Sequence, residues 1–273
     1  MSGSTGPRRL WGNAYQLSDL LDNSPGGQEF AARDFGLLTL AAHLSCHFPR
    51  QLVFKGGFVL RHVHGILRFS QDVDATRHDP AQHKLDALDV AETIRQASIG
   101  DTIRFYPQEP PNTDSAQSLD FDHVRVSGSL LPDSEVQVEI SYREAVVDQP
   151  DLARIGAPFY EDFEILTMAI PEMVAEKLRA MAQRIRATDL ADLAEMLAAH
   201  DVRDVRDDDI ARLALVKFDL VKQGVANRST RIERNLREMG AEYDHVVPAL
   251  FPEARRYSEA MEIVWPRVKK LIP

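Results

Sequence analysis

The stretch that decides the fold is KGGFVLRHVHGILRFSQDVD, residues 55–74. It begins with a lysine and two glycines and ends with two aspartates separated by one valine. The residues just before it, QLVF (51–54), are mostly apolar, and the stretch is short enough for a buried strand. We therefore expect a strand, a glycine corner, a helix that runs to about residue 66 or 67, and a second strand at DVDAT (72–76).

The two aspartates of the second strand are Asp72 and Asp74. In an extended strand, side chains two positions apart share a face, so both carboxylates point the same way and Val73 points into the core. Two solvated aspartates on an edge strand would be the simplest interpretation. The alternative is a divalent cation that offsets their repulsion, because Mg²⁺ prefers oxygen ligands and usually takes one or two carboxylates together with substrate phosphates.

The glycine corner consists of Gly56 and Gly57. Without a Cβ, backbone N–H groups can approach a phosphate closely, and the first turn of a helix favours negative charge. Two glycines alone mark many turns. Followed by an Asp-x-Asp strand, however, they indicate a phosphate site facing a metal site.

A third carboxylate is expected from a neighbouring strand, because phosphoryl chemistry with two metal ions needs one more ligand for the catalytic metal. The segments HVRVSGSL (123–130) and EVQVEISY (135–142) alternate apolar and polar residues and are separated by the turn SLLPDS, which predicts an antiparallel hairpin. Glu139, flanked by Val138 and Ile140, is the candidate ligand. An exposed strand glutamate is the other interpretation.

The remaining elements predict an α+β domain followed by an all-helical domain, because strands come first and helical periodicity begins at about residues 164–171. Before that change we expect helices at 29–47 and 83–98 and a strand at 102–106. After it we expect helices at 171–186, 189–199, 207–223, 229–239 and 252–271. The predicted division is a polar segment over 1–28, an α/β domain over 29–170 and a helical domain over 171–273.

Composition excludes several classes of protein. The 273 residues are 44% hydrophobic and 27% charged, as in a globular protein. The chain has no apolar run of about 18 residues and no apolar stretch near its N-terminus, so we expect a cytoplasmic protein. Its single cysteine, Cys46, lies among apolar residues and is expected to be a buried, inert thiol.

The net charge of −10 argues against indiscriminate coating of nucleic acid. A local exception is the basic stretch 222–237, which carries one glutamate against several arginines. These arginines are candidate RNA contacts: Arg228, Arg231, Arg234 and Arg237. Arginines spaced three apart drift around a helix, so surface ion pairs are the alternative.

The motifs together resemble the AbiEii/AbiGii toxin family of the nucleotidyltransferase superfamily, the toxin half of type IV toxin–antitoxin and abortive-infection modules. That family typically reads Lys-Gly-Gly-Thr, tyrosine-glycine, Arg-Phe-Ser and Asp-Leu-Asp. The matching residues here are Lys55-Gly56-Gly57, Gly65, Arg68-Phe69-Ser70, Asp72 and Asp74, with Arg33-Asp34-Phe35 upstream. The departures are Phe58 for threonine, His64 for tyrosine, and Thr188 where the family has arginine.

The resemblance continues in AEKLRAMAQRIRATDLADL (175–193), which is similar to the family's Glu-Lys-Leu and Arg-Asp-Leu-x-Asp-Leu motif. Its matching residues are Glu176, Lys177, Arg184, Asp189 and Asp192. Lys177 and Arg184 are seven residues apart and share a helix face, which suits a clamp on triphosphate oxygens. A solvated amphipathic face is the alternative.

The resemblance, which covers about residues 29–200, implies a nucleotidyltransferase-like mixed sheet with flanking helices, followed by an all-helical C-terminal bundle. It implies transfer of a nucleoside monophosphate from an NTP to an acceptor hydroxyl, with tRNA 3′ ends as acceptor in some members and a separately encoded antitoxin as partner. Asp72, Asp74 and Glu139 would bind Mg²⁺, in a two-metal site, and Asp189 would orient Lys177 or contact the base. The expected phosphate-binding residues are Lys55, Gly56, Gly57, Arg68, Ser70 and Arg184.

Two other functions remain open from the sequence. An enzyme of the same fold that modifies a small cationic molecule would need an acidic acceptor pocket, which DVRDVRDDD (201–209) could supply. A binding protein without turnover is the second, and the presence of all three carboxylates speaks against it.

Overall fold

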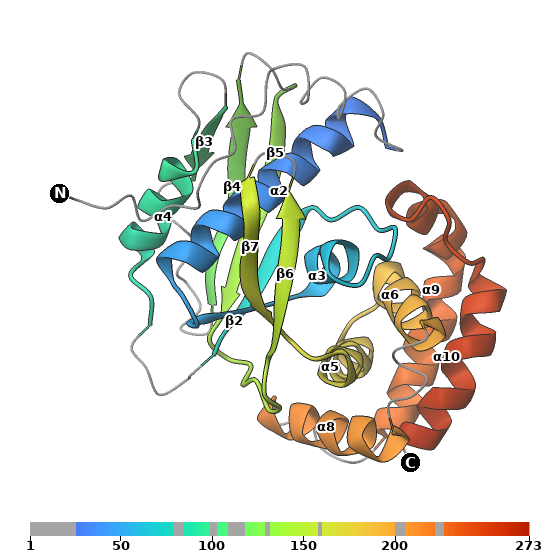
Figure 1. Cartoon of the computed structure of the whole chain (residues 1–273). Coiled ribbons are helices and arrows are strands. Elements are labelled where there is room, and N and C mark those ends of the chain that lie inside the picture. The colour runs from blue at the N-terminus through green and yellow to red at the C-terminus, as the bar shows by residue number, and fades with distance from the viewer. Residues whose placement is uncertain are drawn as a thin grey trace. The chain divides into compact units, whose positions relative to one another are not determined.

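The computed structural model describes residues 26–78, 84–98, 103–108, 118–128, 132–157, 160–199, 206–221 and 227–272. These residues fall into two compact units (Figure 1). The α/β unit consists of the described residues up to Gly65 together with Phe69–Val146 and Pro150–Thr167. The helical unit consists of Ile66–Arg68, Val147–Gln149 and the chain from Met168 onward. Residues 1–25 of the predicted polar segment and residues 129–131 of the predicted turn lie outside the described residues.

The α/β unit is built on a seven-stranded mixed sheet with the order β3-β4-β5-β2-β1-β7-β6. Its strands are β1 Leu52–Lys55, β2 Asp72–Arg77, β3 Arg104–Pro107, β4 Ser118–Ser127, β5 Ser134–Ser141, β6 Asp151–Ala157 and β7 Tyr160–Thr167. Strand β2 runs parallel to β5, and β1 runs parallel to β7. The other neighbouring strands are antiparallel.

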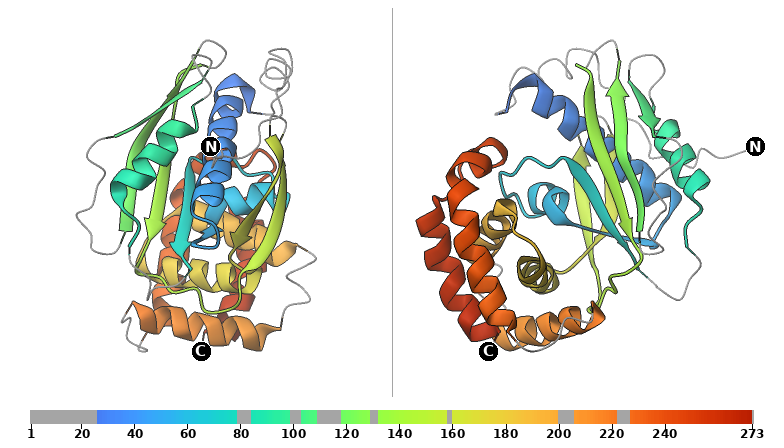
Figure 2. Two further views of the ribbon diagram at one scale, coloured as in Figure 1. Left: turned by 60° about the vertical axis from the view of Figure 1, so that its left-hand side comes forward. Right: turned by 180° about the vertical axis from the view of Figure 1, so that it is seen from behind.

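Three helices belong to this unit: α2 Gly27–His47, α3 Gly56–His62 and α4 Ala87–Gln96. Helix α2 lies across one face of the sheet (Figure 2). A Cβ on Gly36 in this helix would stand 3.3 Å from a Val126 methyl and 3.6 Å from a Val136 methyl, so α2 packs directly on the apolar strand residues. Alternation along the strands then assigns Asp72, Asp74 and Glu139 to the opposite face.

The helical unit contains α5 Ile170–Gln183, α6 Ala187–Ala198, α8 Asp207–Leu220, α9 Arg228–Leu250 and α10 Tyr257–Leu271. Their apolar faces meet in a core of residues such as Val174, Leu190 and Phe218, none of which is exposed. Among the described residues, no helix has the length and apolar character needed to span a bilayer.

The predicted α+β class is confirmed, including the strand, glycine corner and second strand of residues 52–77 and the antiparallel pairing of β4 with β5. Helix α3 ends at His62 rather than near residue 66. The chain then turns at Gly65, whose φ of +68° lies outside the helical range. Strand β4 begins at Ser118, five residues before the predicted start at 123.

Strands β6 and β7 were not predicted from the sequence, and helical periodicity was placed too early, at 164–171. Phe163 and Ile165 are buried and alternate with Asp162 and Glu164, so β7 carried the usual strand signal. Helix α9 continues to Leu250, well beyond the predicted end at 239. The expectation of a buried thiol was also wrong, because Cys46 is exposed near the end of α2.

Candidate active site

A row of four charged side chains crosses the sheet on the face opposite α2. Lys55 on β1 pairs in register with Asp74 on β2, Asp74 with Glu139 on β5, and Glu139 with Asp120 on β4. Directly opposed residues on neighbouring strands project to the same face. We call these residues, Lys55, Asp74, Glu139 and Asp120, the charged row. Asp72 adjoins it, two positions before Asp74 on the same face of β2.

The glycine corner lies against this row. Gly56 has a φ of +70°, a backbone conformation that residues other than glycine rarely adopt. A Cβ at this position would stand 2.4 Å from Asp74 Oδ2, far inside van der Waals contact. The corner therefore needs glycine for two reasons, its backbone conformation and the space taken by the Asp74 carboxylate. The Lys-Gly-Gly and Asp-Val-Asp segments are parts of one site.

The Asp72 carboxylate is oriented by its neighbour Ser70, whose hydroxyl donates to Asp72 Oδ1 at 2.8 Å. Both Asp72 and Asp74 are half-buried, whereas Val73 between them is buried. Ser70, predicted to bind phosphate, is therefore placed against a carboxylate. The hydrogen bond fixes the direction of the Asp72 carboxylate.

Glu139 is an exposed residue of β5, as the alternative interpretation of the sequence had it, but enough protein surrounds its carboxylate to disfavour the ionised form. Partial desolvation by the surrounding protein raises its pKa, and the charges of Asp120, Glu144 and Asp72 raise it further, whereas Lys55 opposes them. The pKa of Asp120 is also raised, first by desolvation, although a hydrogen bond from Ser118 at 2.8 Å partly offsets this. Neighbouring carboxylates that repel one another are a suitable setting for a bound cation.

The chemistry of these residues fits Mg²⁺, which binds carboxylate oxygens. The register supplies Asp72, Asp74 and Glu139 at adjacent positions of one sheet face. Within the described ranges, however, no group of three or more His, Cys, Asp and Glu side chains is gathered as a metal cluster. A cation bound here would have to draw the three carboxylates together.

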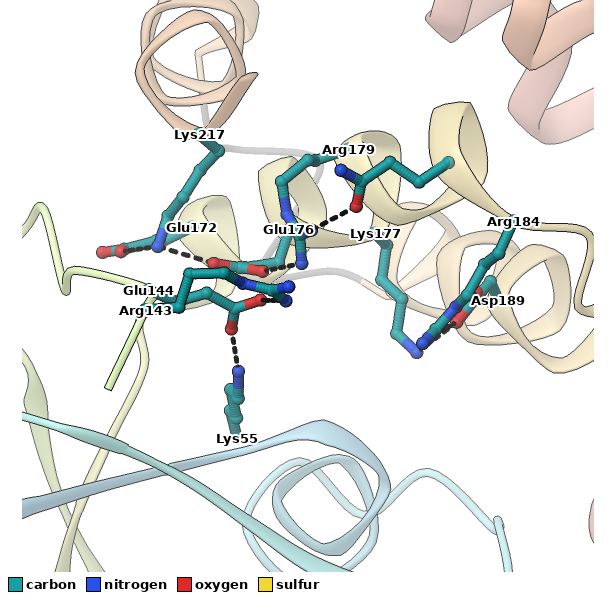
Figure 3. A network of polar contacts seen from close by, with 11 residues as sticks. Lys55, Arg143, Glu144, Glu172, Glu176, Lys177, Arg179, Arg184, Asp189 and Lys217 are labelled. Carbon is teal, nitrogen blue, oxygen red and sulfur yellow. Dashed lines mark hydrogen bonds and ion pairs between the residues drawn. The ribbon is translucent and has the colours of Figure 1, made fainter. Parts of the chain in front are cut away.

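Lys55 forms an ion pair with Glu144, three residues after the end of β5 (Figure 3). Glu144 is buried and also accepts a hydrogen bond from Arg143 at 3.0 Å. Glu144 and Asp120 were both missed in the sequence analysis. The alternation SLDFD (118–122) would have indicated Asp120, but no sequence pattern points to Glu144.

The helical unit holds the second group of predicted site residues. Lys177 Nζ lies 2.8 Å from Asp189 Oδ1 and 2.6 Å from Asp192 Oδ2. The prediction that Lys177 and Arg184 share a helix face was wrong, because α5 ends at Gln183 and Arg184 is extended. Arg184 Nε still lies 2.8 Å from Asp189 Oδ2, and Figure 3 shows Lys177 and Arg184 converging on Asp189. Arg68, predicted to bind phosphate, places its Nε 2.7 Å from Asp192 Oδ1. We call Lys177, Arg184, Arg68, Asp189 and Asp192 the basic cluster.

The charged groups of the basic cluster shift one another's pKa values. Burial alone would raise the pKa of Asp189, but Lys177 and Arg184 outweigh it and hold the pKa well below its usual range. Burial would lower the pKa of Lys177, but Asp189 and Asp192 raise it, so the lysine stays protonated. Three cations therefore face two fully buried carboxylates.

A further ion network in this unit lies around Lys217. Lys217, only 1% exposed, lies 2.6 Å from Glu172 and 2.7 Å from Glu176, as Figure 3 shows. Glu172 also accepts the backbone N–H groups of Val147 and Asp148 at 2.8 Å and 3.0 Å. These bonds tie the segment 147–149 to helix α5.

Of the four arginines predicted to contact RNA, Arg228 is buried and pairs with Asp219 at 3.0 Å. Arg231, Arg234 and Arg237 are exposed on α9. Arg237 lies 2.6 Å from Glu233, and Arg234 lies 3.8 Å from Glu238. In the acidic stretch 201–209, residues 201–205 lie outside the described residues, and Asp207 pairs with Arg267 at 2.6 Å.

A mixed sheet that presents carboxylates on paired strands beside a glycine corner is the arrangement that the resemblance to nucleotidyltransferases implies. Residues 40–265 match the sequence model of the family described as nucleotidyl transferase AbiEii toxin, type IV TA system. The chain belongs to this family. It is a nucleotidyltransferase toxin of the type IV toxin–antitoxin class, and membership implies an NTP substrate, a divalent metal and an antitoxin partner.

Solved structures share the fold. The nucleotidyltransferase toxin MenT4 from Mycobacterium tuberculosis is 20% identical with a TM-score of 0.68, over 95% of this chain and 88% of MenT4. JHP933 from Helicobacter pylori is 17% identical with a TM-score of 0.60, over 90% of this chain and 92% of that protein. The predicted nucleotidyltransferase-like fold is thus confirmed. A comparison with curated proteins finds no match.

Proposed function

We propose that this toxin transfers a nucleoside monophosphate from an NTP to the 3′-terminal hydroxyl of a tRNA and releases pyrophosphate. The observation that carries the proposal is the register of Asp74 with Glu139 beside Gly56, because it joins three separate segments of the sequence at one place on the sheet. The same register brings Lys55 to the end of the charged row.

In this proposal Asp72, Asp74 and Glu139 hold Mg²⁺, which, when bound, supplies positive charge to the phosphate and lowers the pKa of the acceptor hydroxyl. Glu139 would also aid deprotonation of that hydroxyl as a carboxylate base beside the metal. The hydrogen bond that the Ser70 hydroxyl donates fixes the orientation of the Asp72 carboxylate.

Phosphate oxygens are bound in the α/β unit by the backbone of Gly56 and Gly57 and by the ammonium group of Lys55. The helical unit offers Lys177 and Arg184, both held by Asp189, for the charge of the leaving pyrophosphate. An excess of cations over carboxylates in the basic cluster supports this role. Arg68 adds a third cation to this cluster through its ion pair with Asp192.

RNA is proposed as acceptor because Arg231, Arg234 and Arg237 are exposed along α9. Their charge is partly offset by Glu233 and Glu238, so their contribution is to weak, salt-sensitive phosphate contacts rather than to base recognition. Arg228 is left out of this surface because it is buried.

The test is incubation of the purified protein with total RNA and each α-³²P-labelled NTP in turn, with Mg²⁺. We expect labelling of a band of tRNA size with one preferred nucleotide, and its loss in Asp74→Ala. The matched control is Asp89→Ala, an exposed aspartate on α4, which should label like the wild type. Labelling that persists in Asp74→Ala would contradict the proposal that Asp74 binds the metal. Labelling of another RNA would contradict the proposal that tRNA is the acceptor.

A further inference from the structure

Asp34 belongs to the upstream motif over 33–35, to which the proposed reaction gives no task. It lies on α2 and binds one guanidinium group of α3 through both of its oxygens. Arg61 Nε lies 2.9 Å from Oδ1, and Nη2 donates to Oδ2 at 3.0 Å. His62 Nε2 lies 3.1 Å from the same Oδ1. All three side chains are mostly buried, so water screens these ion pairs less than it screens pairs on the surface.

The surroundings of Asp34 keep its carboxylate ionised. Burial would raise its pKa, but the neighbouring His62 and Arg61 outweigh burial and lower the pKa. Two parallel contacts fix the plane of the guanidinium group as well as its position, because a carboxylate matches the planar fork of arginine. Asp34 therefore determines where the guanidinium group of Arg61 lies.

The guanidinium group of Arg61 lies over the ring of Phe69, with its central carbon 5.0 Å from the ring centroid. The same ring stacks on Phe30 of α2, with 4.4 Å between the two centroids. A Cβ on Gly26 would stand 2.7 Å from Phe69 Cζ, so the backbone before α2 approaches the ring as well. Phe69 is only 3% exposed, and these contacts leave the backbone that carries it little freedom.

Phe69 directly precedes the residue that orients a proposed metal ligand. Ser70 is buried, and its hydroxyl donates to Asp72 Oδ1 at 2.8 Å. The side chain of serine is short, so the direction of this hydrogen bond follows the position of the backbone at residues 69 and 70. Helices α2 and α3 and residues 69–72 all belong to the α/β unit. A continuous set of contacts thus leads from Asp34 to the carboxylate of Asp72.

We propose that Asp34 is a positioning residue of the metal site, which holds Phe69 through Arg61 and so directs Ser70 toward the Asp72 carboxylate. This inference rests on the proposed function of the site. In this role Asp34 touches neither substrate nor metal. Residues that orient metal ligands from behind typically change metal affinity or activity by about 10- to 100-fold when they are replaced.

The consequence of losing Asp34 is specific to the metal. In Asp34→Asn, one of the two oxygens becomes an amide that donates hydrogen bonds, so the guanidinium group of Arg61 loses its paired contact. The Phe69 ring then gains freedom, and the Asp72 carboxylate is held less firmly in the direction that binds Mg²⁺. Affinity for Mg²⁺ should fall, whereas kcat at saturating Mg²⁺ should stay close to that of the wild type. A merely structural defect would instead lower the fraction of folded protein at every Mg²⁺ concentration.

The experiment compares the wild type with Asp34→Asn, Asp34→Glu, Ser70→Ala and the double variant Asp34→Asn/Ser70→Ala. The control is Glu195→Gln, which removes the ion pair between Glu195 and Arg255 in the helical unit. Calorimetric titration with MgCl₂ alone gives the Kd for Mg²⁺ without nucleotide. Transfer rates at varied MgCl₂ give the Mg²⁺ concentration for half-maximal activity. Circular dichroism and thermal melting report the fold of each variant.

We expect Asp34→Asn to raise the Kd for Mg²⁺ and the half-maximal Mg²⁺ concentration by about tenfold each. Asp34→Glu keeps the charge and should recover part of both. Ser70→Ala should raise the Kd by a similar factor. The double variant should match Ser70→Ala alone, because Asp34 acts on the metal site through Ser70. The Glu195→Gln control should bind Mg²⁺ like the wild type, even if its melting temperature falls.

An unchanged Mg²⁺ affinity in folded Asp34→Asn would overturn the inference, as would losses that add in the double variant. If Asp34→Asn does not fold, Arg61→Lys decides the question by the same titration, because lysine keeps the charge but not the planar fork. Arg61→Lys should then also weaken Mg²⁺ binding, and an unchanged Kd would contradict the role of Asp34.

Failure of the proposed function gives a different result. If the wild type transfers no nucleotide to any RNA, the proposed function fails, and the titration with MgCl₂ still decides whether Asp34 positions the metal ligand. A wild type that binds no Mg²⁺ would overturn both the assignment of Asp72 to the metal and this inference.

Discussion

The charged row of the α/β unit and the basic cluster of the helical unit have opposite balances of charge. In the row, three carboxylates accompany one lysine, which also pairs with Glu144. In the cluster, three cations surround two carboxylates that are fully buried. In the proposed function, the row would bind a cation and the cluster would bind an anion.

The largest expected effect comes from removing a carboxylate of the charged row. Asp74→Ala should lower nucleotide transfer by about a thousandfold or more, since metal coordination is worth several kcal/mol of transition-state stabilisation. The variant should stay folded, because the half-buried Asp74 contributes charge rather than core packing. Transfer rates with the labelled NTP, together with the melting temperature, check this expectation.

The next effect tests whether the glycine corner belongs to the row. Gly56→Ala should lower transfer by about a hundredfold, because a Cβ displaces the Asp74 carboxylate by a distance large enough to misplace a ligand. Gly65→Ala is the matched control, since its φ of +68° is as unusual but nothing lies within 4 Å of its Cβ. Both variants should lose about 1–2 kcal/mol of stability through backbone strain. Equal activities of the two variants would show that the glycine corner is not part of the active site.

The basic cluster should respond mainly in stability. Asp189→Asn should lower the free energy of unfolding by about 3 kcal/mol, because it leaves Lys177 without one of its buried partners. Asp162→Asn, which breaks an exposed pair with Arg154, should cost about 0.5 kcal/mol or less. Urea unfolding of both variants at pH 7 measures the difference. Similar losses would show that burial of Asp189 adds nothing.

The pH dependence of the Asp189 effect has a definite sign. Its pKa is lower in the folded than in the unfolded protein, so its contribution is present above the ordinary aspartate pKa of 3.8 and is lost as the pH falls below it. The stabilities of the wild type and Asp189→Asn should therefore approach each other between pH 4 and about pH 2. A constant difference over this range would contradict the ion-pair explanation.

The smallest expected effect is a gain in stability rather than a loss. The pKa of Glu139 is raised in the folded protein, so ionisation at neutral pH destabilises it, and the destabilisation disappears as the pH falls below the ordinary glutamate pKa of 4.5. Glu139→Gln should thus raise the melting temperature slightly at pH 7 and not at pH 4, while activity is lost. Glu135→Gln, an exposed glutamate on the same strand that pairs with His123, should show no such gain.

The parts of the fold with strong local signals could be predicted. The glycine corner and the Asp-Val-Asp strand combine turn chemistry with period-two alternation, and they appear at β1, α3 and β2 as expected. Strands β6 and β7 carry alternation as well, but they stand next to the first helix of the helical unit, and the two periodicities merge near residue 167. The parallel pairing of β1 with β7 depends on tertiary contacts that no local pattern shows.

The site was predictable only where a motif marks it. Glu139 could be inferred because its strand has a clear alternation and the chemistry requires a third carboxylate. Asp120 joins the row through the pairing of β4 with β5, and Glu144 follows the end of a strand without any periodic context. The ion-pair partners of Arg68 and Lys177 could likewise not be predicted from the sequence, because ion pairs between residues far apart in the sequence depend on the fold. Their proposed roles in phosphate binding stay predictions.

The short segments 66–68 and 147–149 have a consequence for any attempt to divide the protein. A fragment starting at Met168 would lack the guanidinium group that meets Asp192 and the two amides that meet Glu172. Two buried acids would be left with fewer partners, and such a fragment should aggregate or stay partly unfolded. During synthesis, the helical unit should therefore be completed only when its own residues meet these two segments, which are made before it.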